Sequence, residues 1–250
     1  ATCKYEVWPE LMKQLDAAII PSFVFATYFT ADAYPLRTNP ISKFLFSAWR
    51  RFDRIFTQDE SSSRLLKLRG IDSVIAGDPR ADRVLQIAME STPPSDLKNW
   101  KGDSKVVLAG SSWPEEEGAL ASLSWDDQIK LLIAPHEVNE SNIQRILALF
   151  PNSSRYSSGD LHASVVVIDS IGLLSSLYSL ADLAVIGGGF GSGLHNVLEP
   201  SAFGIPSLSG PKINRFREAL SLQDISALYI SSTPFDLSQQ LKRLLSSENS

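Results

Sequence analysis

The chain has 250 residues, 44% of them hydrophobic, which is enough to bury one or two cores of ordinary domain size. The formal net charge of −5 lacks the basic excess of nucleic-acid-binding proteins, so we expect no nucleic acid among the partners. One cysteine excludes a disulfide framework, and the sequence holds no apolar run of the roughly 18 residues that a transmembrane helix needs.

The first part of the chain predicts both strands and helices. Asp59 is placed to cap a helix, and Gly70 is placed to end it. Residues 43–56 carry apolar and basic side chains at helical spacing and predict an amphipathic helix. In chain order we expect a strand over residues 18–29, helices over 43–56 and 59–68, and a strand over 73–76.

Residues 77–103 predict the connection between two domains. This segment carries Pro79, Pro93 and Pro94 together with many charged residues. We therefore expect one domain over residues 1–80 and a second over residues 81–250.

The rest of the chain predicts a parallel sheet with helices on both faces, because short apolar segments alternate with helical ones. The expected strands cover residues 105–109, 130–134, 164–168 and 183–186, and the expected helices cover 115–123, 140–150 and 172–180. Polar groups follow the strands: Ser111 and Ser112, His136, Asp169, and the glycines 187–189. Ligands of open α/β sheets bind at the carboxyl ends of the strands, so these groups should line one crevice.

A glycine-rich loop follows the strand over residues 183–186. Glycines let the backbone turn sharply and let a ligand approach without meeting a Cβ atom. Pro200 is tolerated only in the first turn of a helix, so the next helix should begin near Asn196 and end at Gly204 and Pro206. The N-terminus of that helix would form an anion site. The loop lacks the G-x-G-x-x-G spacing of dinucleotide-binding folds, so spacing alone leaves the nucleotide open.

The glycine loop, His195, Asn196, Glu199 and the Gly-Ile-Pro at residues 204–206 together resemble the donor-site region of 3-deoxy-D-manno-octulosonic acid (Kdo) transferases. Further segments are similar to this family in the same order along the chain: YEVWP at residues 5–9, FTQDE at 56–60, GDPRAD at 77–82, GSSWPE at 110–115 and APHE at 134–137. Any one of these matches would be weak evidence, whereas their order extends the resemblance over almost the whole chain.

The resemblance implies an α/β protein of the GT-B glycosyltransferase type, with a nearly complete Rossmann-like C-terminal domain and the latter part of a second Rossmann-like domain. It implies transfer of Kdo from CMP-Kdo to the lipid A precursor in lipopolysaccharide biosynthesis, with no cofactor and no metal. The enzyme would be cytoplasmic and peripheral to the bacterial inner membrane. Glu6 is the candidate catalytic acid on the acceptor side. Because the chain opens at Ala1 without a preceding strand, we expect a fragment that lacks the family's general base and transfers no sugar alone.

The resemblance also implies roles for residues near the glycine loop. Glu199 would accept hydrogen bonds from the ribose hydroxyls, and the alternative is an exposed helix acid. Asn196 would cap its helix, contact the ligand, or do both. His195 would either contact phosphate or pair within the loop. Gly188 and Gly189 would lie against the donor.

Other candidates lie outside this loop. His136 is expected at the donor phosphate or carboxylate. Ser111 and Ser112 offer hydroxyl and N–H donors to an anion, although the same residues also suit an ordinary loop. Arg80 is the expected cation for the sugar carboxylate, because a guanidinium pairs with a carboxylate through two hydrogen bonds. His162 has no partner motif and is expected on the surface.

Two alternatives to a Kdo transferase stay open. One is another GT-B transferase or an epimerase that uses a UDP-sugar, and the other is a non-catalytic nucleotide-binding remnant. Residues 43–56 have two interpretations as well. Their basic and aromatic side chains could contact the inner-membrane surface, or the helix could pack on the sheet, as most amphipathic helices do.

Overall fold

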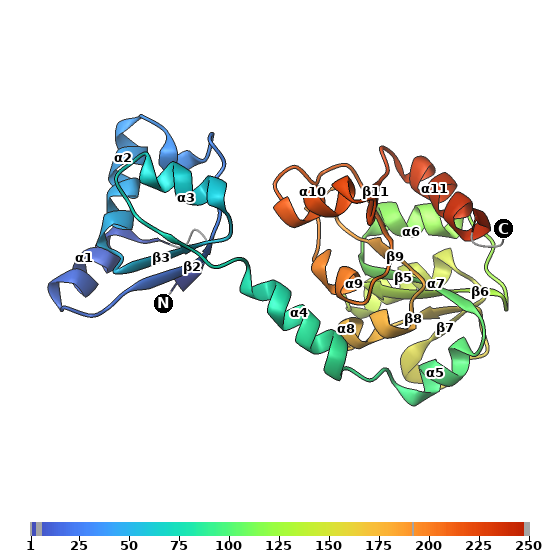
Figure 1. Ribbon diagram of the computed structural model, residues 1–250. Coiled ribbons are helices and arrows are strands. Elements are labelled where there is room, and N and C mark those ends of the chain that lie inside the picture. The colour runs from blue at the N-terminus through green and yellow to red at the C-terminus, as the bar shows by residue number, and fades with distance from the viewer. Residues whose placement is uncertain (1, 4–6, 192, 248–250) are drawn as a thin grey trace. The chain divides into compact units, whose positions relative to one another are not determined.

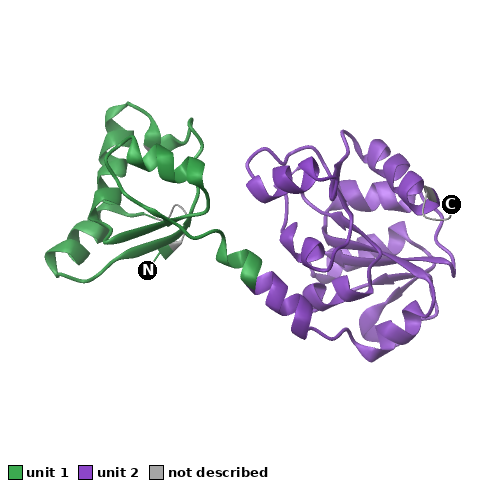
Figure 2. Cartoon of the chain, viewed as in Figure 1, with its two compact units in different colours: residues 1–82 green, residues 83–250 purple. Residues whose placement is uncertain are grey.

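The structure is a computed structural model that describes residues 2–3, 7–191 and 193–247. The chain folds into two compact units, residues 1–82 and residues 83–250 (Figure 2). Glu6, the candidate acid of the acceptor side, lies outside the described residues. Each helix in the described part of the chain is too short or too polar to span a bilayer. The assignment of acceptor and donor roles to residues 1–80 and 81–250 stays a prediction.

The first unit is built on a parallel sheet of four strands in the order β1-β2-β3-β4 (Figure 1). Its strands are β1 (Thr2–Cys3), β2 (Phe23–Thr27), β3 (Arg54–Thr57) and β4 (Val74–Ile75). Its helices are α1 (Pro9–Ala17), α2 (Pro40–Ser47) and α3 (Glu60–Lys67). Phe29, Phe46 and Trp49 are almost completely buried and form one core with residues of β2 and β3.

The strand expected over residues 18–29 is confirmed only in its middle, as β2. Ala18 and Ile19 belong to the end of α1, because their N–H groups donate to the carbonyls of Gln14 and Asp16. Ile19 has a φ of +56° and is 90% exposed. The apolar run therefore begins as a helix terminus, and only its later part is buried in the sheet.

The prediction of a helix over residues 43–56 is wrong for the second half of that segment. Helix α2 starts earlier, where the Asn39 side chain accepts a hydrogen bond from the Ser42 N–H (2.9 Å). After α2 and one turn of 3-10 helix (Ala48–Arg51), the chain becomes β3. Strand β3 pairs with β2 on one side and with β4 on the other, and this pairing overrides the helical pattern.

Helix α2 and the following turn bury only part of their apolar surface. Phe46 and Trp49 lie in the core of the first unit, whereas Ile41 and Phe44 are 63% and 64% exposed. Packing on the unit's own core therefore accounts for the first pair and leaves the second pair exposed.

Helix α3 and its two boundaries are confirmed. The Asp59 side chain accepts a hydrogen bond from the Ser62 N–H (2.6 Å), as expected of an N-cap residue. Gly70, after the helix, has the left-handed φ of +71° that glycine adopts without strain.

The segment between residues 77 and 103 is largely helical. It forms α4 (Pro79–Glu90) and α5 (Ser95–Lys101). Pro79 is the first residue of α4 and Pro94 directly precedes α5, so the prolines that suggested a loop instead mark helix starts.

The second unit is built on a parallel sheet of seven strands in the order β11-β10-β9-β5-β6-β8-β7, and this sheet confirms the predicted α/β class (Figure 1). The strands are β5 (Lys105–Ser112), β6 (Ile129–Pro135), β7 (Ser153–Arg155), β8 (Val165–Val167), β9 (Leu183–Ile186), β10 (Ser207–Ser209) and β11 (Leu228–Ile230). The remaining helices are α6 (Pro114–Ala121), α7 (Glu140–Leu149), α8 (Leu174–Leu177), α9 (Leu198–Ala202), α10 (Arg217–Asp224) and α11 (Pro234–Ser247).

Both faces of this sheet are covered by a hydrophobic core. Along β5, Val106 and Leu108 join the core that contains α5, α8 and α10 residues. Val107 and Ala109 join the opposite core, with residues of α6, α7 and α11. Because neighbouring side chains of a strand point to opposite faces, a strand covered on both faces is apolar throughout.

The sequence analysis predicted none of β7, β11, α10 and α11. Strand β7 is a short polar edge strand with no apolar pattern. Helix α11 did carry a signal, because the buried leucines 237, 241 and 245 recur at intervals of four residues.

Candidate functional site

The carboxyl ends of three adjacent strands carry most of the candidate residues. Strand β5 ends in Ser111 and Ser112, His136 follows β6, and the glycines 187–189 follow β9. Since β9, β5 and β6 are parallel neighbours, these loops lie at one edge of the sheet, which confirms their expected convergence. The His136 N–H also donates to the Ser112 carbonyl (3.0 Å).

Three aromatic side chains from different loops form a stack at this edge. The ring of Trp113 lies over that of His136, with centroids 4.7 Å apart and an interplanar angle of 21°. The His136 and His195 rings have centroids 4.5 Å apart. The indole Nε1–H of Trp113 donates to His195 Nε2 (3.0 Å). We call these three residues the aromatic stack.

The hydrogen bond from Trp113 determines the state of His195. A ring nitrogen that accepts a hydrogen bond carries no proton, so His195 is neutral, with its proton on Nδ1. Burial and the neighbouring His136 both lower the pKa of His195, which agrees with this neutral form. His195 thus pairs at the loop through Nε2 and retains one N–H donor.

The Glu199 carboxylate is held from two sides. Its Oε2 accepts a hydrogen bond from the Ser175 hydroxyl on α8 (2.9 Å), and its Oε1 accepts one from Asn196 Nδ2 (2.9 Å). Asn196 Oδ1 in turn accepts from the Leu198 N–H (3.1 Å), but the N-cap of α9 is Val197 and has no side-chain capping hydrogen bond, so the prediction of Asn196 as the cap is wrong by one residue. Glu199 is half-buried, in contrast to the alternative of an exposed helix acid.

Helix α9 differs from its prediction in start and length. It begins at Leu198 instead of Asn196 and contains only five residues, with Pro200 in its first turn. Gly204 follows it with a φ of +72°, as expected of a residue that ends a helix. A helix of little more than one turn has a small dipole, so the expected anion site depends on local N–H and side-chain donors instead.

The loop glycines are explained by contacts between backbones. A Cβ atom on Gly187 would lie 1.9 Å from the Ser111 carbonyl oxygen, and one on Gly189 would lie 2.5 Å from the Gly210 nitrogen. Gly188 has a φ of +84°. Protein backbone therefore occupies the positions that the sequence analysis assigned to an approaching ligand. The donor-binding role of Gly188 and Gly189 stays a prediction.

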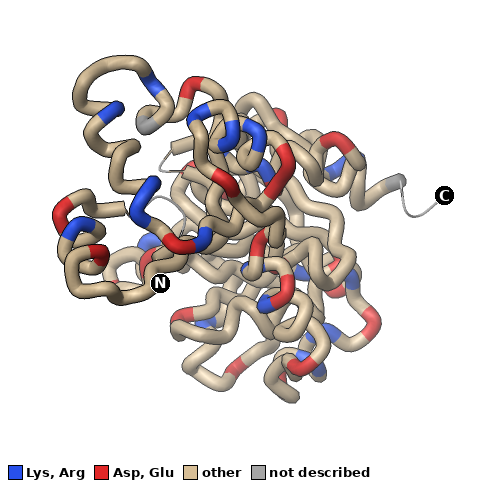
Figure 3. The backbone as a smooth tube through the Cα atoms, turned by 60° about the vertical axis from the view of Figure 1, so that its left-hand side comes forward, with Lys and Arg blue, Asp and Glu red and all other residues tan. Residues whose placement is uncertain are grey.

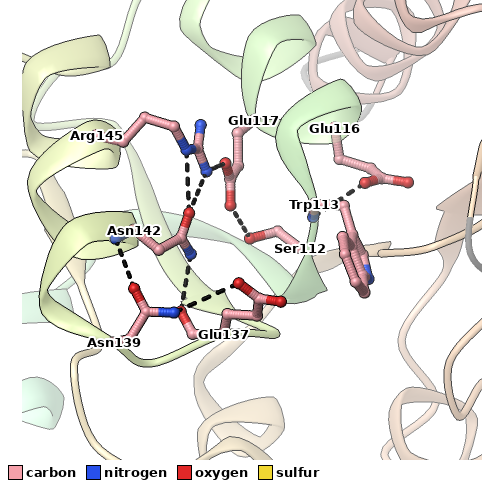
Figure 4. Close-up of polar contacts among 8 residues, drawn as sticks. All are labelled: Ser112, Trp113, Glu116, Glu117, Glu137, Asn139, Asn142 and Arg145. Carbon is pink, nitrogen blue, oxygen red and sulfur yellow. Dashed lines mark hydrogen bonds and ion pairs between the residues drawn. The ribbon is translucent and has the colours of Figure 1, made fainter.

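The Ser112 hydroxyl belongs to a buried polar network that joins β5, α6 and α7 (Figure 4). Ser112 is 2% exposed and donates to Glu117 Oε1 (2.9 Å), and Arg145 forms an ion pair with the same carboxylate. Arg145 also donates to Asn142 Oδ1 (2.7 Å). The Ser112 side chain thus stabilises the loop that carries Trp113.

Glu116 is the residue of this site that sequence reasoning missed. Its side chain is completely buried, and its Oε2 accepts the Trp113 N–H (3.1 Å) (Figure 4). Burial raises the pKa of Glu116 to about 7. An acid three residues after a helix N-cap was a visible signal, but two consecutive buried glutamates were not predictable from local pattern.

The remaining candidates lie elsewhere. Arg80 belongs to the first unit, where its Nη2 pairs with Asp78 Oδ2 (2.6 Å). His162 is 95% exposed, which confirms its expected surface position. Asp169, expected to line the crevice, forms an ion pair with Arg155 and accepts a hydrogen bond from the Ser157 N–H (3.0 Å).

Charged residues of both signs occur along the described part of the chain. Acidic and basic residues are interspersed along the backbone of both units (Figure 3). Within the described ranges, no group of three or more His, Cys, Asp or Glu side chains is arranged to hold a metal ion. That the protein needs no metal stays a prediction.

Comparison with known sequences gives relatives of one kind. A protein named 3-deoxy-D-manno-octulosonic acid transferase from Haemophilus influenzae is 28% identical over 98% of this chain and 61% of its own length. One of the same name from Bordetella pertussis is 27% identical over 86% of this chain and 53% of its own length. The chain thus spans about three fifths or less of these relatives. No family model matches it.

Solved structures agree on the fold. The C-terminal CMP-Kdo binding domain of WaaA from Acinetobacter baumannii matches 66% of this chain, with 22% identity, a TM-score of 0.54 and 91% of that domain covered. A putative UDP-N-acetylglucosamine 2-epimerase from Listeria monocytogenes matches 96% of this chain and 70% of its own, with 14% identity and a TM-score of 0.60. These matches confirm the expected GT-B type of fold.

Proposed function

Because the chain is related by sequence to the 3-deoxy-D-manno-octulosonic acid transferases along almost its whole length, we propose that it binds CMP-Kdo as part of a glycosyltransferase that delivers Kdo to the lipid A precursor. The observation that carries this proposal is the relationship over 98% of the chain. The carboxyl edge of the second unit supports it, because polar and aromatic side chains from three loops contact one another there.

In this proposal Glu199 binds the ribose of the nucleotide. Ser175 and Asn196 each occupy one acceptor position of its carboxylate and orient it. A carboxylate offers about four acceptor positions, so each oxygen retains room for a ribose hydroxyl. Because the carboxylate is already ordered, it can accept hydrogen bonds from the two vicinal ribose hydroxyls at a smaller cost in side-chain entropy.

The aromatic stack binds the donor phosphate. His136 is exposed at the carboxyl edge and His195 retains its Nδ1–H, so each offers a hydrogen-bond donor to an anion. Ser111 has a φ of +50°, which turns the backbone at the end of β5. With Gly188 and Gly189 it supplies the backbone of the phosphate loop, and the departing CMP is stabilised by these donors.

Residues of the first unit contribute to binding of the sugar and of the acceptor. Arg80 is oriented by Asp78, and a guanidinium pairs with a carboxylate through two hydrogen bonds, so Arg80 is the proposed partner of the Kdo carboxylate. Ile41 and Phe44 project from α2 beside Lys43 and form an apolar and basic surface suited to anionic lipid at the inner membrane.

Isothermal titration of the chain with CMP and UDP tests the proposed donor. We expect CMP to bind and UDP to bind at least tenfold more weakly. Tighter binding of UDP would favour the alternative of a UDP-sugar transferase or epimerase. Titration with CMP-Kdo then separates donor binding from binding of the nucleotide alone.

A further inference from the structure

The first turn of α6 contains two consecutive glutamates whose side chains are completely buried, and their surroundings differ. Glu117 accepts the Ser112 hydroxyl and pairs with Arg145. Glu116 Oε2 accepts the N–H of Trp113, whereas Oε1 has no hydrogen-bond partner within the described part of the chain. Glu116 is thus a buried carboxyl with no cation to compensate a charge.

Burial without a cation favours the neutral form of Glu116. Burial raises its pKa to about 7, and the neighbouring Glu115 acts in the same direction. The backbone N–H groups of Glu116 itself, Trp113 and Gly188 act in the opposite direction, and burial outweighs them. Near neutral pH the carboxyl therefore exists in both protonation states.

Charged groups on the packed elements leave this balance unchanged. Arg145 on α7 is engaged with Glu117. Helix α11 packs on α6 and carries Asp236, Lys242 and Arg243, but none of them is among the causes that set the pKa of Glu116. At the glycine loop, His195 is neutral, and Lys212 Nζ donates to the Gly191 carbonyl (3.2 Å).

Glu116 is connected to the aromatic stack by two successive hydrogen bonds. Glu116 Oε2 accepts a hydrogen bond from the Trp113 backbone N–H (3.1 Å). The Trp113 indole N–H in turn donates one to His195 Nε2 (3.0 Å). The same indole lies on His136. A Cβ atom on Gly188 would lie 3.2 Å from His195 Cδ2, so the Gly188 amide near Glu116 also borders the stack.

We propose that Glu116 is a positioning residue that must carry a proton for the site to accept the phosphate of the donor. This inference rests on the proposed function of the second unit. The neutral carboxyl holds Trp113 without placing a negative charge beneath the phosphate, whereas the carboxylate repels the anion. Binding of CMP therefore transfers a proton from the buffer to Glu116, and by reciprocity a rise in pH weakens CMP binding.

Titration calorimetry of the chain with CMP, in buffers of different ionisation enthalpy, measures this proton. At pH 7.5 we expect an uptake of about half a proton and, between pH 6 and 9, up to about a tenfold loss of affinity, for a rise of about one unit in the pKa of Glu116 on binding. Glu116→Gln keeps an acceptor for the Trp113 N–H and cannot ionise, so it should bind CMP without this uptake. Glu115→Gln, at an exposed position of the same turn, removes a charge that raises the pKa of Glu116, so it should reduce the uptake without abolishing it.

If proton uptake is unchanged in Glu116→Gln, the proton belongs to the histidines and the inference is overturned. An equal loss of proton uptake in the Glu115 and Glu116 variants would overturn it as well. A failure of every variant to bind CMP would overturn the proposed function. Carbon-13 NMR of the glutamate carboxyls in the unmutated, ligand-free chain gives an independent readout. A resonance that titrates near pH 7 and is missing in Glu116→Gln supports the inference, and titration of all glutamates below about pH 5.5 rejects it.

Discussion

Glu199 has the properties of a ligand-binding acid because its carboxylate is ordered yet half-buried. Ser175 and Asn196 hold one oxygen each, so neither oxygen is free to rotate away from the carboxyl edge of the sheet. Two polar side chains arranged around one acid are unnecessary if that acid is merely a solvated helix residue. The arrangement favours the ribose-binding interpretation.

Glu199→Ala should therefore weaken CMP binding by about ten- to a hundredfold, since each hydrogen bond from a hydroxyl to a charged acceptor contributes about 1.5–3 kcal/mol. Titration calorimetry measures the loss. Glu137→Ala, which removes an exposed acid after β6, is the control and should leave the affinity within about twofold. An unchanged affinity in Glu199→Ala would place the ribose elsewhere.

The glycines of the loop make a second prediction for single residues. Gly187 touches the Ser111 backbone so closely that a Cβ atom cannot fit, whereas the nearest atom to a Cβ on Gly191 is Glu115 Oε1 at 3.6 Å. Gly187→Ala should lower the free energy of unfolding by at least about 2 kcal/mol, and Gly191→Ala should change it by less than about 1 kcal/mol. Urea denaturation measures both. Equal effects would contradict the contact between the loops.

Helix α6 places two buried acids with different surroundings side by side in one turn. Glu117 forms an ion pair with Arg145. One carboxyl oxygen of Glu116 has no hydrogen-bond partner among the described residues. Burying a carboxyl without a cation costs stability whenever the carboxyl is ionised. An acid at this position therefore needs a reason other than folding, and the aromatic stack that it supports supplies one.

The raised pKa of Glu116 also predicts the pH dependence of stability. Glutamate in the unfolded chain titrates near 4.5, whereas Glu116 in the folded chain titrates near 7. Between these values the folded state keeps a proton that the unfolded state releases, so its contribution to stability falls as the pH rises from 4.5 to 7. This loss should be absent in Glu116→Gln. The difference in free energy of unfolding between the variant and the unmutated chain should therefore be up to about 3 kcal/mol more favourable to the variant at pH 8 than at pH 4. Urea denaturation at both pH values measures this gain, and Glu115→Gln should show only a small part of it, because burial is the larger cause of the raised pKa of Glu116.

At the scale of the whole molecule, the two units have separate cores and separate sheets. Each candidate donor-site residue other than Arg80 belongs to the second unit, and Arg80 precedes the boundary by two residues in α4. The residues proposed for the nucleotide thus belong to the second unit, and the residue proposed for the sugar carboxylate is Arg80.

Arg80→Ala tests the role proposed for this arginine. Its proposed partner is the Kdo carboxylate, so the variant should lose about ten- to a hundredfold in CMP-Kdo affinity and keep its CMP affinity. Arg83→Ala, an exposed arginine one turn further along α4, should change neither. Equal losses for CMP and CMP-Kdo in the Arg80 variant would reject the carboxylate role.

Local patterns in the sequence determined the class of the fold and the edge of the sheet at which most candidate residues lie. Apolar segments closed by glycine or polar residues predict the buried strands β5, β6 and β9, and parallel strands place their ends together. The caps of α3 and the glycine after α9 were predictable for the same reason. Capping and left-handed turns depend on a few neighbouring residues.

Tertiary structure alone decided the features that depend on residues far apart in the chain. The pairing of β3 with strands on both sides overrode a helical pattern, and the approach of Gly187 to Ser111 gave the glycine a role that its sequence context did not reveal. The burial of Glu116 and the contact of Trp113 with both histidines likewise require loops separated by tens of residues to meet. Burial and close approach belong to the packed molecule, whereas periodicity and capping are already present in the sequence.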